Sequence, residues 1–393
     1  ATNPGSNIPT LADRALFLMV LALLFLIPLY LNIKAHDQFE LPKLTLLRIS
    51  TCVMLALFAI KTIFAGRLVY RRTPLDIPLV LFALINIITT FTSFAPHLSF
   101  RGEYENFAGS FSNLNYIILY FLAAQAVTNA FRFKAAAAAF IASGVLLTAY
   151  AVAQFYGFDF INWSEGSVIK GRYFASMGNP NFLGAMLIMM MPLVISFAVI
   201  FLKKSKTAAA VLLSLLFIFM YISLFGTQSR GPFLGFVFST LFIAFYGMLI
   251  LFRKEAEGKN PAEALVIIIT RHKRWVTAAA VVLAVALALS LTIGKNATLR
   301  ITSSVADIGG SLKQSRLHIW VPAIKMIKDR PFFGTGVDTF KTVFPSYAGT
   351  EFAHIDGANV ASRTAHNEPL HIAATMGLTG LGIYILLIIA YSL

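Results

Sequence analysis

The sequence predicts an all-α fold, a polytopic bundle of transmembrane helices with one large extracytoplasmic loop. Hydrophobic residues make up 58% of the 393 residues and charged residues only 12%, with a mean hydropathy of +0.76. This composition excludes a soluble globular domain of the same length. Apolar runs of about twenty residues, the length that crosses a bilayer, recur along the chain. The basic residues also gather in alternate short loops, which is typical of a multi-pass membrane protein.

Hydropathy predicts about ten membrane spans, in three regions. Residues 1–293 are expected to form the first nine spans, residues 294–365 the large extracytoplasmic loop, and residues 366–393 the last span. Because the chain stops after Tyr391 without a basic flank, we expect the natural protein to continue with further spans. The predicted spans are Leu11–Ile33, Leu44–Phe64, Leu75–Phe94, Phe111–Val127, Ala135–Tyr156, Phe182–Leu202, Ala208–Phe225, Phe233–Phe252, Val276–Ile293 and Ile372–Leu393.

Loop charge predicts the orientation of the bundle. By the positive-inside rule, basic loops face the cytoplasm, and so does the N-terminus near Arg14. The segments 95–110, 157–181, 226–231 and 294–365 then lie outside. The cytoplasmic loops are marked by Arg67, Arg71 and Arg72, by Arg132 and Lys134, by Lys203, Lys204 and Lys206, and by Arg253, Lys254, Arg271, Lys273 and Arg274.

The large outer loop contains a predicted amphipathic helix over Lys313–Lys328, which Pro331, Gly334 and Gly336 bring to an end. Such a helix lies on the membrane surface or packs on the bundle, and the pattern leaves both open. Its expected apolar stripe is Leu317, Trp320, Val321, Ile324 and Ile327.

Several function classes are disfavoured by what the sequence lacks. The net charge of +15 is interpreted as loop charge that sets topology, so we expect no nucleic-acid partner. The single Cys52 excludes an intrachain disulfide and a thiolate cluster. The outer carboxylates Glu103 and Glu105 have no recognisable metal-site spacing, so no metal or cofactor is expected. No phosphate-binding loop for ATP occurs, and no predicted span has an acidic residue at its middle, which disfavours an ion-coupled carrier.

Cationic side chains occur in four outer segments, where short loops normally lack them. The segments are Gly171–Asn181, Thr227–Pro232, Ser315–Trp320 and Arg363–Asn367. Each arginine taken alone is more often a snorkelling side chain at a span end. Together they indicate an anionic ligand, and a diphosphate suits bidentate guanidinium groups best.

His366 is the candidate proton acceptor, because it stands beside Arg363 where the last span begins. The alternative interpretation is structural, since Asn367 is a common helix-start residue and the histidine would then only flank a cap. His318 is a weaker candidate, and His371 is interpreted as facing lipid headgroups or the bundle.

At these residues the chain resembles the O-antigen ligase and polymerase family of integral membrane glycosyltransferases. The resemblance covers about residue 100 to the end, and the motifs occur in the family's order. They are Gly171-Arg172 with Met177-Gly-Asn-Pro-Asn181, Ser229-Arg230-Gly231, Arg316 with Trp320 and Asp329-Arg-Pro331…Gly334-Thr-Gly336, Ala365-His366-Asn367, and the Arg101–Gly109 segment.

The resemblance implies transfer of a glycan from an undecaprenyl-diphosphate carrier at the outer face of the bacterial cytoplasmic (inner) membrane. The acceptor would be a lipid, a saccharide or a protein hydroxyl, and membrane lipid surrounds the site. Arg172 and Arg230 would hold the diphosphate and His366 would assist the attacking hydroxyl, with inversion and without a metal. The expected substrate-binding residues are Arg316, Arg363, Asn367, Arg101, Asn179 and Trp320.

Other readings remain open. A polysaccharide polymerase of the same family is not separable from a ligase by these residues. A lipid-linked oligosaccharide flippase also explains basic residues near a lipid headgroup, although only Arg48 and Lys61 are cations well inside predicted spans. A non-catalytic scaffold of the cell envelope leaves Arg230 and His366 unexplained.

Overall fold

The computed structural model describes residues 8–68, 70–104, 106–161, 163, 172–255, 270, 317–349, 352 and 361–392, and the structural statements below concern these residues. Their regular elements are all helices, without a strand among them, which confirms the predicted fold class. The chain divides into two compact units. Unit 1 comprises Ala1–Leu23, Asn32–Ala136 and Ala306–Leu393, and unit 2 comprises Leu24–Leu31 and Ala137–Val305.

Nine of the ten predicted spans fall on helices, and the tenth, Val276–Ile293, lies outside the described residues. By length and hydropathy five of the described helices can cross a membrane, namely α2, α6, α7, α8 and α17, which fits a multi-pass membrane protein. The nine helices are α1 (Ile8–Leu26), α2 (Glu40–Ala65), α3 (Asp76–Phe91), α5 (Ser110–Ala126), α6 (Ala130–Phe155), α7 (Pro180–Lys203), α8 (Thr207–Gly226), α9 (Arg230–Glu255) and α17 (Glu368–Ser392).

The first helix is shorter than its hydropathy predicts. It ends at Leu26 rather than at Ile33, although the apolar run continues. Pro28 supplies the reason, because proline has no backbone N–H to donate and disfavours a helical conformation at the residue before it. Hydropathy reports the length of the apolar run, whereas the backbone chemistry sets the end of the helix.

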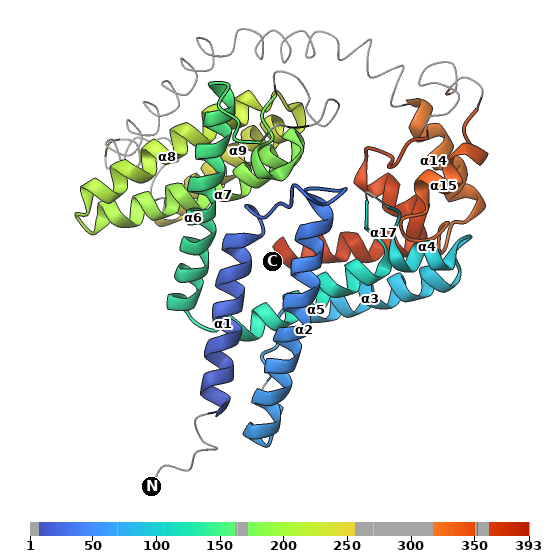
Figure 1. The fold of residues 1–393 in the computed structure, drawn as a ribbon, viewed down its shortest axis with the longest axis horizontal. Helices are drawn as coiled ribbons and strands as arrows, with labels where there is room; N and C mark the ends of the chain where they lie inside the picture. The colour runs from blue at the N-terminus through green and yellow to red at the C-terminus, as the bar shows by residue number, and fades with distance from the viewer. Residues whose placement is uncertain are drawn as a thin grey trace. The chain divides into compact units, whose positions relative to one another are not determined.

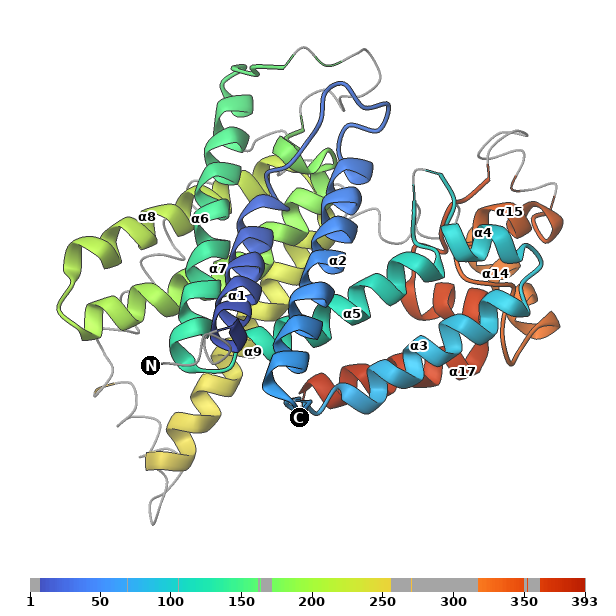
Figure 2. The same ribbon diagram turned by 60° about the horizontal axis from the view of Figure 1, so that its bottom comes forward.

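In unit 1, α17 is the element on which the others assemble. The helix α3 lies along it, and α14 (Leu317–Asp329) and α15 (Phe340–Val343) pack on its N-terminal half (Figures 1 and 2). The short helix α4 (Pro96–Arg101) joins α3 to α5 and packs on both. A buried apolar cluster joins α14, α15 and α17 through Ile319, Ala323, Met326, Phe340, Val343, Phe344, Phe352, Ala365 and Ala374.

A backbone kink in α17 receives the segment that follows α14. At Gly377 the φ of 73° breaks the helix. The N–H of Leu378 donates to the carbonyl of Pro331 (2.7 Å), and the N–H of Thr335 donates to that of Ala374 (3.0 Å). A Cβ at Gly334 would lie 2.4 Å from the carbonyl carbon of Thr375, so only glycine permits this approach. The turn residues that were predicted to end α14 therefore also join it to the last span.

The predicted amphipathic helix is present over Leu317–Asp329, its residues 313–316 lie outside the described part of the chain, and its apolar stripe divides between a packed and an exposed side. Of the expected residues, Trp320 and Ile327 pack against the buried cluster. The residues Leu317, Val321 and Ile324 are instead exposed (44%, 49% and 44%). The face that packs on unit 1 carries Ile319, Pro322, Ala323 and Met326. The helix has apolar residues on more than one face, and the position of α17 decides which of them is buried.

Three helix ends of unit 1 meet at one acidic side chain. Asp13, near the start of α1, forms ion pairs with Lys61 near the end of α2 (2.6 Å) and with Arg132 near the start of α6. The guanidinium of Arg132 also stacks over Phe17. All three ends are those that the loop charges assign to the cytoplasm. Lys61, one of the two cations placed inside a predicted span, is therefore part of a structural ion pair.

Unit 2 is built around α7, which packs against α8 and α9. The 3₁₀ turn η2 (Ala175–Met177) precedes α7 and packs on its start. The buried core lies mainly between α7 and α8 and includes Leu183, Leu187, Met190, Met191, Val194, Phe217, Met220, Tyr221 and Leu224.

Candidate functional site

His366 stands on the segment that leads into α17, with its side chain exposed to solvent. Its backbone has a φ of 51°, in the left-handed region that side-chain-bearing residues rarely adopt. Trp320 of α14 donates its indole Nε1–H to the carbonyl of Ala365 (2.9 Å), directly before the histidine. Asn367, directly after it, accepts the N–H of Leu370 through Oδ1 (3.2 Å) and so caps α17. The imidazole is therefore presented from a backbone that is fixed on both sides.

The remaining residues of this predicted cluster have different positions. Arg363 is exposed near His366, whereas Arg316 lies outside the described residues. His371, one turn into α17, packs its ring against Phe340 with the centroids 5.2 Å apart. Its Nδ1 is buried without a hydrogen-bond partner. Trp320, predicted to bind substrate, uses its only donor to hold the backbone beside His366.

Arg172 of unit 2 is held by the turn between α8 and α9. Its Nε donates to the carbonyl of Thr227 (2.8 Å), and its Nη2 donates to Oγ of Ser229 (2.8 Å). Arg230 follows Ser229 directly as the first residue of α9. Two of the predicted arginine motifs therefore meet in unit 2, although they are separated by more than fifty residues in sequence. His366 belongs to unit 1, so its position beside these arginines stays a prediction.

The loop that carries Arg172 is organised by Asp159. This carboxylate accepts hydrogen bonds from the hydroxyl of Tyr150 (2.7 Å), from Nε2 of Gln154 (2.8 Å) and from Nε1 of Trp163 (2.8 Å). Gln154 in turn accepts the N–H of Ala175 (2.9 Å) through Oε1. Burial raises the pKa of the Asp159 carboxyl, but these hydrogen bonds outweigh burial and hold its pKa below the usual range.

Asn179, another predicted substrate-binding residue, caps the start of α7. Its Oδ1 accepts the N–H of Asn181 (2.8 Å), and Pro180 occupies the first helical position, where its missing N–H costs nothing. The Met177–Asn181 motif thus forms a helix start in the structure.

The Arg101–Gly109 segment of unit 1 is a pinched loop whose two ends touch. A Cβ on Gly109 would lie 2.2 Å from the backbone nitrogen of Gly102, so the neck requires glycine at both positions. Asp338, on the chain between α14 and α15, fills the loop. It accepts the N–H of Glu103 (2.8 Å) and the N–H of Ala108 (3.0 Å), and the amide of Asn106 also donates to it.

Asp338 is an acidic side chain that is almost completely buried (6% exposed). Burial raises the pKa of its carboxyl, the three hydrogen bonds lower it, and the nearby charge of Glu103 raises it, so the pKa lies above its usual value. Glu103 itself pairs with Lys341 (2.7 Å). Sequence reasoning missed Asp338, although its place two residues after the Gly334-Thr-Gly336 motif was a signal.

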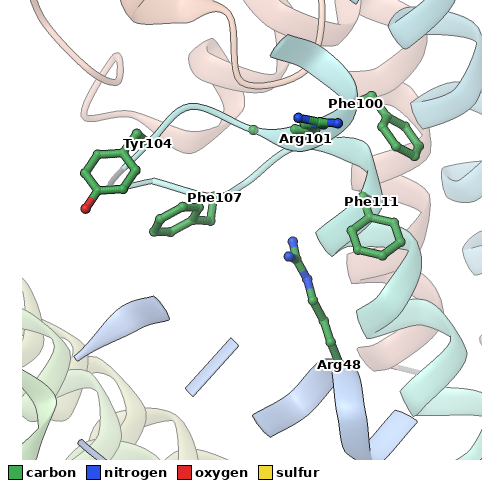
Figure 3. Close-up of a pocket in the computed structure, with 7 residues that line it drawn as sticks. Arg48, Phe100, Arg101, Tyr104, Phe107 and Phe111 are labelled. Atoms are coloured by element: carbon green, nitrogen blue, oxygen red, sulfur yellow. The ribbon is translucent and has the colours of Figure 1, made fainter. Parts of the chain in front are cut away.

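Beside this loop lies a cavity of about 410 Å³ that contains two arginines. Figure 3 shows the guanidinium of Arg48 extending from α2 toward the loop that carries Arg101. Arg48 donates to Oγ of Ser112 (2.9 Å) and stacks over the ring of Phe111, 4.6 Å from its centroid. The full lining is Arg48, Phe100, Arg101, Gly102, Tyr104, Phe107 and Phe111. Arg101 was predicted as a binding residue, whereas Arg48 was considered only as a cation within a span.

Strained backbone gathers in the segments singled out by sequence. Six residues other than glycine have a positive φ within the described part of the chain, and five of them fall in, or directly beside, segments predicted to lie outside the membrane. Only Ser205 lies in a loop assigned to the cytoplasm. Such conformations persist where the surrounding structure determines them, and they are frequent at functional sites. The five are Phe107, Ala175, Gln228, Asp338 and His366.

Among the described residues, no group of three or more histidine, cysteine, aspartate or glutamate side chains could hold a metal ion.

Comparison with known proteins gives one family. Residues 215–385 match the family model described as O-Antigen ligase, which confirms the resemblance over that region. The match includes Arg230, Trp320 and His366, whereas Arg48, Arg101 and Arg172 precede it. Neither a curated protein nor a solved structure matches the chain.

Proposed function

Since residues 215–385 match the O-antigen ligase family, we propose that the protein transfers a glycan from an undecaprenyl-diphosphate donor to an acceptor hydroxyl. The family supports a membrane glycosyltransferase-like enzyme whose partners are a lipid-linked saccharide and membrane lipid. The donor, the outward-facing site and the roles of individual residues are our proposal. The reaction takes place at the outer face of the cytoplasmic membrane.

The observation that carries the proposal is the presentation of His366. The backbone of His366 is in the left-handed region, and it is held there by the Trp320 hydrogen bond before it and the Asn367 cap after it. This conformation costs free energy that the fold would not need to spend on an ordinary surface residue. A general base needs such a fixed position, because proton transfer requires approach to about 3 Å of the reacting hydroxyl or to one bridging water.

The proposed reaction is a single displacement. The acceptor oxygen bonds to the anomeric carbon while its proton passes to the neutral imidazole of His366. The bond from that carbon to the diphosphate oxygen breaks with its electron pair, so negative charge builds on the leaving group. Arg172 and Arg230 stabilise this charge, because guanidinium groups bind phosphate oxygens bidentately. Attack opposite the leaving group inverts the anomeric centre.

The arrangement around Arg172 supports this role. Its bonds to Thr227 and Ser229 fix the plane of the guanidinium before any ligand arrives. A charged group that is already oriented needs little reorganisation when charge develops on the leaving group. The protein therefore provides electrostatic stabilisation with residues of its own. The matched family supports ligase-like or polymerase-like transfer, so a polysaccharide polymerase stays the alternative to the proposed ligase.

The test is transfer by the purified protein in lipid nanodiscs, with undecaprenyl-diphosphate glycan and candidate acceptors, in EDTA and without ATP. We expect a product of inverted configuration. His366→Ala should reduce turnover on the order of 10² to 10⁴ while donor binding is kept. The matched control is His97→Ala, which removes an exposed histidine from α4 and should leave turnover unchanged. Wild-type turnover by His366→Ala would assign the histidine a structural role only.

A further inference from the structure

We infer that the cavity between Arg48 and the Arg101–Gly109 loop binds the phosphate group of a membrane lipid. This inference does not rest on the proposed function, because it concerns a binding site of unit 1 whether or not His366 is catalytic. Three features of the cavity support this inference, namely its charge, its aromatic walls and the helices from which its residues come.

The cavity is cationic and lacks a matching acidic group. Two of its seven lining residues are arginines and none is acidic. Among the described residues no carboxylate forms an ion pair with Arg48 or Arg101. The acidic side chains that the structure describes near the cavity are engaged elsewhere, because Glu103 pairs with Lys341 and Asp338 accepts the loop N–H groups. Two guanidinium groups that share one cavity repel each other unless an anion lies between them.

The protein provides hydrogen-bond acceptors for only part of the Arg48 guanidinium. One of its terminal nitrogens donates to Ser112, but its Nε is buried without a partner. A buried donor without an acceptor costs about 1–3 kcal/mol, and more when the group is charged. A phosphate oxygen is the acceptor that fits a guanidinium best, since it accepts two parallel N–H bonds.

The aromatic walls indicate a lipid rather than a free anion. Four of the seven lining residues are aromatic, and Phe100, Tyr104 and Phe111 expose 47%, 50% and 44% of their surface. A free phosphate would make no use of these rings. A hydrocarbon chain attached to the phosphate would cover them and remove apolar surface from water.

The helices that carry the two arginines indicate where the cavity lies relative to the membrane. Arg48 belongs to α2, which is long and apolar enough to cross a membrane, and its neighbours Ile49 and Val53 are exposed on that helix. Arg101 ends α4, a short helix in an outer segment. A ligand that touches both must have its charged group at the membrane boundary and its chain toward the bilayer, as a lipid does.

The walls are held in place before a ligand binds. Asp338 fastens the loop through backbone N–H groups on both of its sides. The hydroxyl of Tyr104 lies 2.8 Å from Nδ1 of His36, on the chain between α1 and α2. A preorganised loop lowers the entropy that must be lost on binding.

The inference is tested by lipid binding to the full-length purified chain in detergent. The probe is tritiated dioleoyl phosphatidic acid, and the competitors are undecaprenyl phosphate, dioleoylglycerol and inorganic phosphate. We expect undecaprenyl phosphate to compete, and dioleoylglycerol and inorganic phosphate to fail at the same concentration. Arg48→Gln and Arg101→Gln should each weaken binding at least about tenfold, the change expected when a charge-assisted bond to phosphate is lost.

The matched control is Lys34→Gln, which removes one exposed positive charge from the same unit and should change affinity less than about twofold. If dioleoylglycerol competes as well as undecaprenyl phosphate, the cavity is only an apolar groove. If inorganic phosphate competes equally well, the cavity is a simple anion site. Either result overturns the inference, as does wild-type affinity of Arg101→Gln or equal weakening by Lys34→Gln. If Arg48→Gln does not fold, the exposed Arg101 decides alone. The assay requires no turnover, so inactivity of the enzyme would not affect it.

Discussion

In each unit a single aspartate holds one loop by accepting several hydrogen bonds, an arrangement that we call a clamp. The two clamps are built differently. Asp159 of unit 2 collects donors from nearby residues, with Tyr150 only nine positions away. Asp338 of unit 1 collects donors from Glu103 and Ala108, 235 and 230 positions away. The first clamp forms with its own stretch of chain, whereas the second forms only after distant segments have assembled.

The two clamps also differ in charge state. The pKa of Asp159 is lowered, because hydrogen bonds from side chains and backbone outweigh its burial. The pKa of Asp338 is raised, because burial and the charge of Glu103 outweigh its hydrogen bonds. A carboxyl group can thus hold a loop whether its pKa is lowered or raised. The balance of hydrogen bonds, burial and neighbouring charge decides which of the two occurs.

One arginine in each unit also differs in how completely the protein binds its guanidinium group. Arg172 of unit 2 is bonded to a carbonyl and a hydroxyl of the protein, which orient it. Arg48 of unit 1 stacks on a ring and keeps a buried nitrogen without a partner. The first is suited to stabilise developing charge, and the second is suited to receive a permanent anion.

The largest expected effect comes from removing the long-range clamp. Asp338→Ala leaves the N–H groups of Glu103 and Ala108 without acceptors and replaces an aspartate at a φ of 56°. We expect the free energy of unfolding to fall by about 3 kcal/mol or more. Asp159→Ala should cost less, about 1–2 kcal/mol, since its site is partly open to water. Thermal and denaturant unfolding measure both, and a larger cost for Asp159 would reverse the comparison.

The next effect concerns the orientation of Arg172. Arg172→Lys keeps the charge but cannot bond Thr227 and Ser229 with one rigid plane. We expect turnover to fall on the order of 10², as for the loss of one oriented donor to developing charge. Ser229→Ala removes only one of the two bonds and should reduce turnover less. Steady-state transfer assays decide, and equal rates for Arg172→Lys and the wild type would contradict the proposed role.

Lowering the pH should change the stability contributions of Asp159 and Asp338 in opposite directions. The lowered pKa of Asp159 means that its contribution to stability is present above the unfolded value, about 3.9, and is lost as the pH falls through the folded value. The raised pKa of Asp338 has the opposite sign, so its contribution is present at low pH and is lost as the pH rises through the folded value.

Hydrogen exchange between pH 7 and pH 3, corrected for intrinsic rates, measures this difference. Protection of residues 159–161 should decrease on acidification, whereas protection of residues 103–108 should be kept or increase. Asp159→Asn should abolish the decrease, because amides do not titrate in this range. Parallel loss of protection in both loops would show that the clamps are alike.

The smallest expected effect tests how His366 is held. Trp320→Phe removes the donor to the carbonyl of Ala365 but keeps an aromatic ring in the cluster. One hydrogen bond contributes about 1 kcal/mol, so we expect turnover to fall roughly fivefold with donor affinity unchanged. The control is Tyr120→Phe, which removes a hydroxyl that donates to Thr73 and should leave turnover unchanged. A loss of donor affinity in Trp320→Phe would instead place the indole on the substrate.

Much of the fold followed from the sequence, because hydropathy and helix chemistry are local. Nine predicted spans fall on helices, and Asn367 caps the last of them as its residue type predicts. The motifs also led to the family that residues 215–385 match. Strained backbone was not predictable in detail, although four of the residues with positive φ fall in segments that the sequence singled out, namely Phe107, Ala175, Gln228 and His366.

Only the tertiary structure decided which distant residues meet. The apolar stripe of α14 left open which side packs on the protein. Leu317, Val321 and Ile324 are exposed because the position of α17 and not the helical period selects the buried side. The pairing of Arg172 with Thr227 and the clamp of Asp338 on the Arg101–Gly109 loop join segments far apart in sequence. A pattern along the chain gives each residue's local conformation, whereas contacts between segments depend on how helices pack, which is a property of the whole assembly.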